Sequence, residues 1–134
     1  MKKQAEIKVV IAEPMREAFI YTIKNELEEL QKIVGGYIET LDFTREDNVT
    51  IICNEEGKIN GMALNRSLAH EGEIWEIIAG TMIIVGDDYE NGEFISLTDE
   101  QAEKYLNQFL KPEVFYKMNN EIVSVKVEEN FWEV

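Results

Sequence analysis

The feature that most constrains the fold of this chain is a series of short runs rich in β-branched and apolar residues, each bounded by turn-forming residues. Runs of this kind predict strands, because β-branched side chains suit a pleated, half-buried backbone. Turn formers such as Glu13-Pro14 separate the runs, and Gly80 divides the longest of them. The runs are residues 6–12, 17–23, 37–43, 49–53, 74–79, 81–85 and 93–97. They predict a mostly antiparallel sheet of about seven strands.

Two other segments follow helical spacing. Residues 25–34 carry a narrow apolar stripe, and Asn25 is the expected N-cap. In residues 98–111, Thr98 and Gln101 have the spacing of a capping box. Both helices are short and one-sided, so they are expected to pack on the sheet. The predicted fold class is therefore α+β.

The rest of the chain is less regular. Residues 58–73 show no clear period and are predicted to form a structured loop with one helical turn near Ser67. The C-terminal extension, residues 107–134, is predicted to contain a hairpin that turns at Asn119-Asn120. Phe131-Trp132 are expected to dock on the domain, because exposed aromatic rings on a free tail would favour aggregation.

Composition limits the class of function. The 134 residues suffice for a single domain (residues 1–134), and a hydrophobic share of 45% is enough for one core. A net charge of −14, from 27 acidic and 13 basic residues, argues against direct nucleic-acid binding and against attraction to an anionic membrane. No apolar run approaches the ~20 residues that cross a bilayer, and the start of the chain shows no secretory signal. With only one cysteine, we expect a cytoplasmic protein.

The negative charge is distributed unevenly. Residues 1–34 contain six acidic and six basic residues, so the whole net charge of −14 falls in residues 35–134. Two interpretations stay open. The acidic part could form a binding face for a basic partner, or it could serve only to keep the protein in solution.

The sequence offers little that favours catalysis. It lacks glycine-rich phosphate-binding motifs, and one cysteine with one histidine cannot supply an ordinary zinc site. Cys53 ends an apolar strand and His70 lies in a polar segment, so a catalytic pair of the two is disfavoured. Residues 87–92 resemble a calcium loop only superficially and are expected to be a solvated hairpin tip. Nothing orients Glu55 or Glu56 toward a nucleophile or metal, so we expect no catalytic residue, no metal and no cofactor.

The segment that best fits a binding site follows the strand at residues 49–53. It gathers amide donors, carboxylates and one guanidinium in a region of little regular structure. The candidate ligand-binding residues are Asn54, Glu55, Glu56, Lys58, Asn65, Arg66 and Trp75. Arg66 either holds an anionic or nucleobase-bearing ligand or pairs internally with one of the acids Glu55, Glu56 or Glu71. Trp75 either stacks on a base or fills the core.

Five segments occur in the order and spacing of a known family. They are residues 30–39 (LQKIVGGYIE), 54–58 (NEEGK), 65–66 (NR), 78–81 (IAGT) and 97–99 (LTD). In these segments, residues 6–106 resemble domain of unknown function 3846, a family found in phages and mobile elements of bacteria. Met62-Ala63-Leu64 and Glu76 depart from the family's pattern, which has a proline near the former and an aspartate in place of the latter. The extension, residues 107–134, lies outside the resemblance.

The resemblance implies a context, that of an accessory protein acting in the host cytoplasm during infection or transfer. Together with the acidic excess, it leads us to expect a non-enzymatic protein that antagonises a host defence system. Its acidic surface would bind a host defence protein with a basic surface. The alternative is a protein that binds or sequesters a small anionic ligand of nucleotide type through residues 54–66. A homo-oligomer is a further expectation, because exposed sheet edges pair between copies, and the C-terminal hairpin is the expected place.

Overall fold

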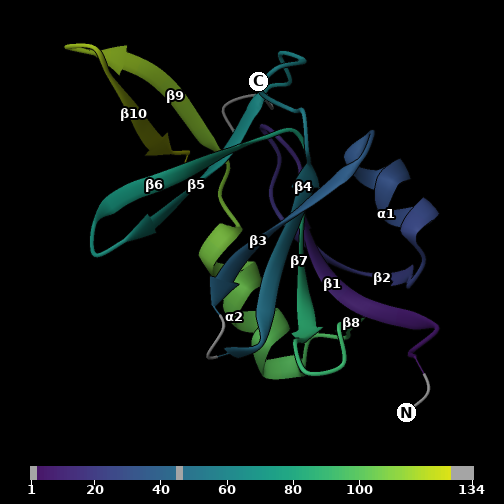
Figure 1. Ribbon diagram of the computed structural model, residues 1–134. Helices are drawn as coiled ribbons and strands as arrows, with labels where there is room; N and C mark the ends of the chain where they lie inside the picture. Colours follow the sequence, from purple (N-terminus) through teal and green to yellow (C-terminus); the bar gives the residue numbers. More distant parts are fainter. Residues whose placement is uncertain (1–2, 45–46, 128–134) are drawn as a thin grey trace.

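Ten strands and two helices make up the described part of the chain, residues 3–44 and 47–127 of the computed structural model (Figure 1). The strands are β1 (Glu6–Ala12), β2 (Phe19–Lys24), β3 (Ile38–Thr44), β4 (Val49–Asn54), β5 (Leu64–His70), β6 (Glu73–Ala79), β7 (Met82–Asp88), β8 (Glu93–Ile95), β9 (Glu113–Met118) and β10 (Glu121–Lys126). The helices are α1 (Leu27–Val34) and α2 (Asp99–Phe109). Neither helix is long and apolar enough to span a membrane. The predicted α+β class is confirmed.

A six-stranded antiparallel sheet forms the centre of the molecule. Its strand order is β2-β1-β7-β4-β3, and β8 pairs with the end of β7. Because side chains alternate along a strand, each strand contributes to both faces. Val9 and Ile83 lie on the face that α1 covers, and Val10 and Ile84 lie on the face that α2 covers. The two helices therefore lie on opposite sides of the sheet (Figure 1), and β2 and β3 form its edges.

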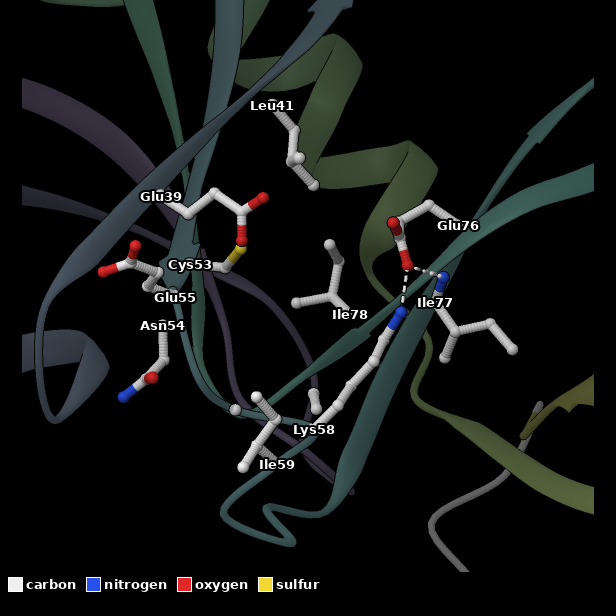
Figure 2. A pocket seen from close by; sticks show the side chains of 12 residues that line it. Glu39, Leu41, Cys53, Asn54, Glu55, Lys58, Ile59, Glu76, Ile77 and Ile78 are labelled. Carbon is white, nitrogen blue, oxygen red and sulfur yellow. Dashed lines mark hydrogen bonds and ion pairs between the residues drawn. The ribbon is translucent and has the colours of Figure 1, made fainter.

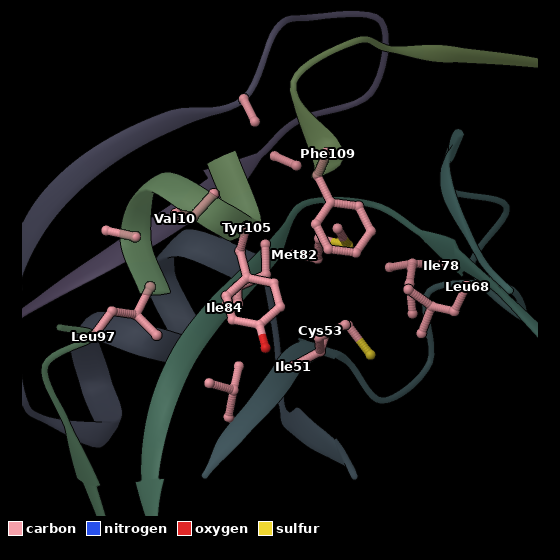
Figure 3. Packing of buried hydrophobic residues seen from close by; sticks show 14 residues of the cluster. Val10, Ile51, Cys53, Leu68, Ile78, Met82, Ile84, Leu97, Tyr105 and Phe109 are labelled. Atoms are coloured by element: carbon pink, nitrogen blue, oxygen red, sulfur yellow. The ribbon is translucent and has the colours of Figure 1, made fainter. Parts of the chain in front are cut away.

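The larger hydrophobic cluster lies on the α2 face (Figure 3). Tyr105 and Phe109 of α2 are buried with Met82 and Ile84 of β7 in one cluster. Burying a side chain of this size contributes about 1.5–3 kcal/mol. The Tyr105 hydroxyl donates to Asp47 at 2.5 Å, and this bond, with help from Lys104, lowers the pKa of the carboxyl. The core of α2 is thus tied to the connection between β3 and β4.

Helix α2 begins where the sequence predicts. The Oγ1 atom of Thr98 accepts a hydrogen bond from the N–H of Gln101 at 3.1 Å, and the Gln101 side chain accepts one from the N–H of Thr98 at 2.9 Å. Two backbone donors that a helix start leaves unpaired are satisfied in this way. The capping box is confirmed.

The start of α1 differs from the prediction. Asn25 is buried, and its Nδ2 donates to the carbonyl oxygens of Gln4 and Phe94, both at 3.0 Å. Glu26 precedes the helix without a side-chain cap, so the expected N-cap role of Asn25 is wrong. Its amide instead joins the start of the chain to β8. At the other end, Gly35 adopts φ 80°, a left-handed conformation that favours glycine.

Residues 58–73 are not the loop that the sequence predicts. Leu64–His70 forms β5, which pairs with β6 in a separate two-stranded sheet, and Ser67 lies in that strand instead of a helical turn. Leu68 and Ile78 of this hairpin pack into the cluster on the α2 face. Two register shifts within β5 interrupt its regular alternation. The alternation of inward and outward residues that marks a strand is therefore not visible in the sequence of residues 64–70.

The C-terminal extension contains the predicted hairpin. Strands β9 and β10 pair across Asn119-Asn120, whose φ angles of 51° and 67° suit a type I′ turn. Glu113, at the start of β9, is buried and accepts hydrogen bonds from the hydroxyls of Ser67 at 2.5 Å and Ser124 at 2.9 Å. This carboxylate fastens the hairpin to β5. Phe131-Trp132 lie outside the described residues, as does any docking they make.

Candidate functional site

A pocket of about 270 Å³ lies between the β3–β4 part of the main sheet and strand β6 (Figure 2). The connection from β4 to β5 supplies its third wall. We call it the acidic pocket. The residues that line it are Glu39, Leu41, Cys53, Asn54, Glu55, Gly57, Lys58, Ile59, Glu76, Ile77, Ile78 and Ala79. Of the sequence candidates it brings together Asn54, Glu55 and Lys58, whereas Glu56 is exposed on the neighbouring turn.

The acidic pocket combines apolar walls with charged groups. Leu41, Cys53 and Ile78 come from three strands and supply apolar surface. The charged groups are three carboxylates and one ammonium, those of Glu39, Glu55, Glu76 and Lys58. Negative charge therefore exceeds positive charge among the residues that line the pocket.

The ammonium group of the pocket is paired. Lys58 Nζ forms an ion pair with Glu76 Oε1, which also accepts a hydrogen bond from the N–H of Ile77 at 3.0 Å. Burial acts to raise the pKa of Glu76, but the hydrogen bonds from Lys58 and Ile77 and the charge of Lys58 outweigh it, so this pKa is lowered. Glu76 is a carboxylate at neutral pH, and it is the ion-pair partner of Lys58.

The thiol of Cys53 shows the effect of these charges. Burial raises its pKa, and the carboxylates of Glu39 and Glu76 raise it further against the opposing effect of Lys58, to about 11. Cys53 is therefore a protonated thiol at neutral pH and a poor nucleophile. Burial disfavours any charge at this place, but the charges of Glu39 and Glu76 disfavour an anion and favour a cation.

The connection from β4 to β5 is held close to β6 by short contacts. A Cβ added to Gly57 would stand 2.7 Å from the carbonyl oxygen of Ala79, so this position requires glycine. Asn54 Nδ2 donates to the carbonyl of Val34 at 3.1 Å, and its Oδ1 accepts from the N–H of Glu56 at 2.8 Å. The amide of Asn54 is therefore used by the fold, where it joins the end of α1 to this connection.

Asn65 and Arg66 lie in the interior and do not line the acidic pocket. Arg66 is 0% exposed, and its guanidinium donates to the carbonyl oxygens of Phe109 at 3.0 Å, Glu13 at 3.3 Å and Arg16 at 2.7 Å. Its Nη1 also donates to Asn65 Oδ1 at 2.8 Å. The Asn65 amide donates to two further backbone carbonyls. Both side chains thus hold together the β1–β2 connection, β5 and the end of α2.

The partners of Arg66 differ from those expected for an internal pair. Among the described residues its hydrogen bonds go to carbonyl oxygens, and none goes to Glu55, Glu56 or Glu71. Burial lowers the pKa of Arg66 to about 10, against the opposing effect of the Glu113 charge. The guanidinium remains a cation at neutral pH. Its role in this structure is to support the fold.

Trp75 lies in a second hollow, of about 510 Å³, between β6 and β10. We call it the β6–β10 groove. Trp75 is 48% exposed in its wall, so the expectation that it fills the core is wrong. The groove is lined by Lys58, Leu64, Ile74, Trp75, Glu76, Ile77, Glu121 and Ile122. Lys58 and Glu76 line both hollows, which places the two side by side.

The remaining sequence candidates show ordinary surface contacts. His70 lies at the exposed end of β5, with its Nε2 3.9 Å from Glu71, and it does not line the pocket that contains Cys53. In the turn after β7, Asp88 accepts hydrogen bonds from the N–H and Nδ2 of Asn91 at 3.2 and 2.7 Å. Across residues 3–44 and 47–127, no group of three His, Cys, Asp or Glu side chains is placed to hold a metal ion.

Sequence reasoning misses two carboxylates of the pocket, Glu39 and Glu76. A signal existed for Glu39, because aligning the predicted strands around residues 37–43 and 49–53 as a hairpin sets Glu39 opposite Cys53, as observed. No comparable signal existed for Glu76. Its position depends on β6 pairing with β5, which the sequence does not predict.

The fold and the pocket define this chain as an α+β domain with an acidic hollow beside one edge of its main sheet. A family model described as domain of unknown function 3846 matches residues 7–110, and the chain belongs to this family. The match leaves β9 and β10 outside the family domain. Comparison with curated proteins and with solved structures found no match.

Proposed function

We propose that this chain is a non-enzymatic binding protein that engages a basic protein partner through the acidic pocket. The observation that carries the proposal is the make-up of the pocket, where apolar walls accompany three carboxylates and one ammonium that is already paired. A Lys or Arg side chain has the complementary form, since an apolar stem carries its charged head. The pocket therefore suits a basic side chain that projects from a partner surface.

The charges of the pocket favour a cation over an anion. The carboxylates that help to raise the pKa of Cys53 would stabilise an ammonium or guanidinium brought to the same place. Within the described part of the chain, the carboxylates of Glu39 and Glu55 have no hydrogen-bond donor, so a cation would provide charge-assisted bonds. The donors expected to hold an anionic ligand, Asn65 and Arg66, are instead buried and bonded internally.

We further propose a biological setting for this binding. The partner is a host defence protein with a basic surface, and the chain is an accessory protein of a phage or mobile element that antagonises it in the host cytoplasm. The resemblance of residues 6–106 to a family found in such elements supports the setting. The net charge of −14 supports a basic partner, because complementary potentials accelerate encounter and make it sensitive to salt.

A labelled peptide of alternating arginine and glycine tests the pocket directly. A peptide with glutamine in place of each arginine is the uncharged control. The double variant Glu39→Gln/Glu55→Gln is expected to weaken peptide binding about tenfold, since two partly exposed charge contacts of up to ~1 kcal/mol each are lost. The control Glu100→Gln/Glu103→Gln removes the same charge from the exposed side of α2 and should change affinity little. Equal losses in both variants would assign the binding to net charge alone and refute a pocket site.

The exposure of Trp75 favours a second candidate function, the binding of a small planar ligand of nucleotide type. The ring would stack on the ligand in the β6–β10 groove, where Lys58 also lines the wall. In a thermal-shift screen, a nucleotide present at 100 times its dissociation constant should add about 2.7 kcal/mol of stability. If Trp75→Leu abolishes this stabilisation and Glu39→Gln/Glu55→Gln does not, the small-ligand candidate is favoured over the basic partner.

A further inference from the structure

We propose that β2 is a self-association edge, through which two copies of the chain pair antiparallel with Thr22 on the two-fold axis. Strand β2 is the outermost strand of the order β2-β1-β7-β4-β3. Within the described residues, β1 is the strand that pairs with it, and its other edge has no strand partner. An open strand edge offers a row of backbone donors and acceptors to another chain.

The side chains of β2 suit this role. Phe19, Ile20 and Tyr21 are consecutive and exposed, and Tyr21 is 58% exposed. The rings of Phe19 and Tyr21 meet edge to face with centroids 6.2 Å apart. The opposite edge of the sheet, β3, instead exposes Glu39, and charged side chains on an edge oppose pairing between copies. On β2 the charged side chain is Lys24 at the end of the strand, so the residues before it lack this protection.

The hydrogen bonds around β2 show which of its backbone groups face outward. The N–H of Asn25 donates to the carbonyl of Ala5 at 2.9 Å, in register with the β1–β2 pairing. Because hydrogen-bonded and non-hydrogen-bonded pairs alternate in an antiparallel ladder, odd-numbered residues of β2 face β1. Ile20, Thr22 and Lys24 therefore direct their N–H and C=O groups away from the sheet.

A contact from α2 limits the length of the open edge. The N–H of Ala18 also points outward, and it donates to the carbonyl of Leu110 at 3.0 Å. The open edge thus runs from Ile20 to Lys24. A two-fold axis at Thr22 opposes Ile20 of one copy to Lys24 of the other and pairs the outward groups of all three residues. An axis nearer the start of β2 would require the N–H of Ala18, which is already bonded.

The distribution of charge selects a second copy as the occupant of this edge. Residues 1–34, which include β2, contain equal numbers of acidic and basic residues, whereas the remainder carries the whole −14. Two copies repel each other through most of their surface, so an association between them is least opposed at this neutral segment. A basic partner would be drawn to the acidic part instead. Because the paired edge is short, the dimer is expected to dissociate on dilution.

Sedimentation of the full chain over a concentration series tests the proposal. The wild type is expected to shift from its 15.5 kDa monomer toward twice that mass, and salt should strengthen the dimer by screening the negative charge. Ile20→Lys puts a charge on both copies at the edge and should weaken the dimer by roughly tenfold or more. Ile74→Lys is the matched control, because Ile74 on β6 is 41% exposed and Ile20 is 42% exposed.

Cross-linking tests the register and does not depend on the lysine variants folding. Thr22→Cys should form a disulfide-linked dimer under mild oxidation, because directly opposed, hydrogen-bonded residues have Cα atoms about 5.5 Å apart. Thr40→Cys on the exposed β3 edge should not, and Cys53 is too buried to take part. A wild type that stays monomeric throughout the series overturns the proposal. So does a dimer that persists in a folded Ile20→Lys variant, or equal cross-linking of both cysteine variants.

Discussion

Replacing the buried Arg66 tests whether this residue supports the fold, as the structure indicates, or binds a ligand. Its guanidinium makes four hydrogen bonds, to the backbone carbonyls of Phe109, Glu13 and Arg16 and to the side chain of Asn65. Arg66→Met keeps a long apolar side chain and removes every donor. Four acceptors then lose their partner, and three of them are backbone carbonyls far from Arg66 in the sequence.

The expected loss of stability follows from the burial of these bonds. An acceptor left buried without a donor costs about 1–3 kcal/mol. The bonds to Phe109 and Asn65 are buried, whereas those to Glu13 and Arg16 are partly buried, so water can replace part of the latter. We expect Arg66→Met to lower the free energy of unfolding by about 3–5 kcal/mol, a large part of the 5–15 kcal/mol typical of a domain. Arg66→Lys keeps the charge without the planar fork and should cost about 2 kcal/mol.

Urea denaturation followed by circular dichroism measures these losses, provided the slope with urea is the same for each variant. The control is Lys117→Met, which removes an exposed cation from β9 and should change stability by less than about 0.5 kcal/mol. A midpoint for Arg66→Met that equals the wild-type midpoint would refute the reasoning, because buried acceptors cannot lose their donors without cost. If Arg66→Met instead abolished nucleotide binding and left the stability unchanged, Arg66 would be a ligand-binding residue.

Three further predictions concern single positions. The folded-state pKa of Cys53, about 11, exceeds the ordinary 9.0, so the stability it contributes is complete below pH 9 and falls by roughly 2–3 kcal/mol as the pH rises to about 11. Urea midpoints across this range should show that fall in the wild type and lack it in Cys53→Ala. Thr98→Ala removes the helix cap of α2 and should cost about 1 kcal/mol in urea denaturation, whereas Thr98→Ser should recover most of it. Gly57→Ala pushes a methyl group against the carbonyl of Ala79 and should cost about 1–3 kcal/mol by thermal unfolding, and an unchanged midpoint would show that this contact is loose.

Features of the fold that depend on neighbours in the sequence are predictable from it. The capping box of Thr98 and Gln101 and the turn at Asn119-Asn120 are examples, since each needs only a few adjacent residues. Strand β5 is not predictable in this way, because Arg66 occupies one of its core positions. The backbone acceptors that make a buried arginine acceptable come from two segments remote in the chain, the β1–β2 connection and the end of α2. Local pattern alone therefore indicates a polar loop.

The same limit applies to the candidate site. Glu55 and Lys58 lie in the segment that the sequence singles out, and both line the acidic pocket. Asn65 lies in that segment too, but its side chain turns into the core, because the strand that carries it packs against the main sheet. Glu39 and Glu76 join the pocket only through strand pairing. The pocket is thus set by register, which composition and spacing do not specify.

The strand order places β2 and β3 at opposite edges of the main sheet, and this separation has a consequence for avidity. A dimer joined through β2 leaves the two acidic pockets unobstructed, each beside the edge farthest from the two-fold axis. Such an assembly is bivalent. On a target that repeats its basic sites at a matching distance, the second contact forms within one complex, and the overall affinity can rise by roughly 10²–10⁴ without any new contact. Repetitive targets such as filaments or symmetric oligomers would then be preferred over single copies of the same surface.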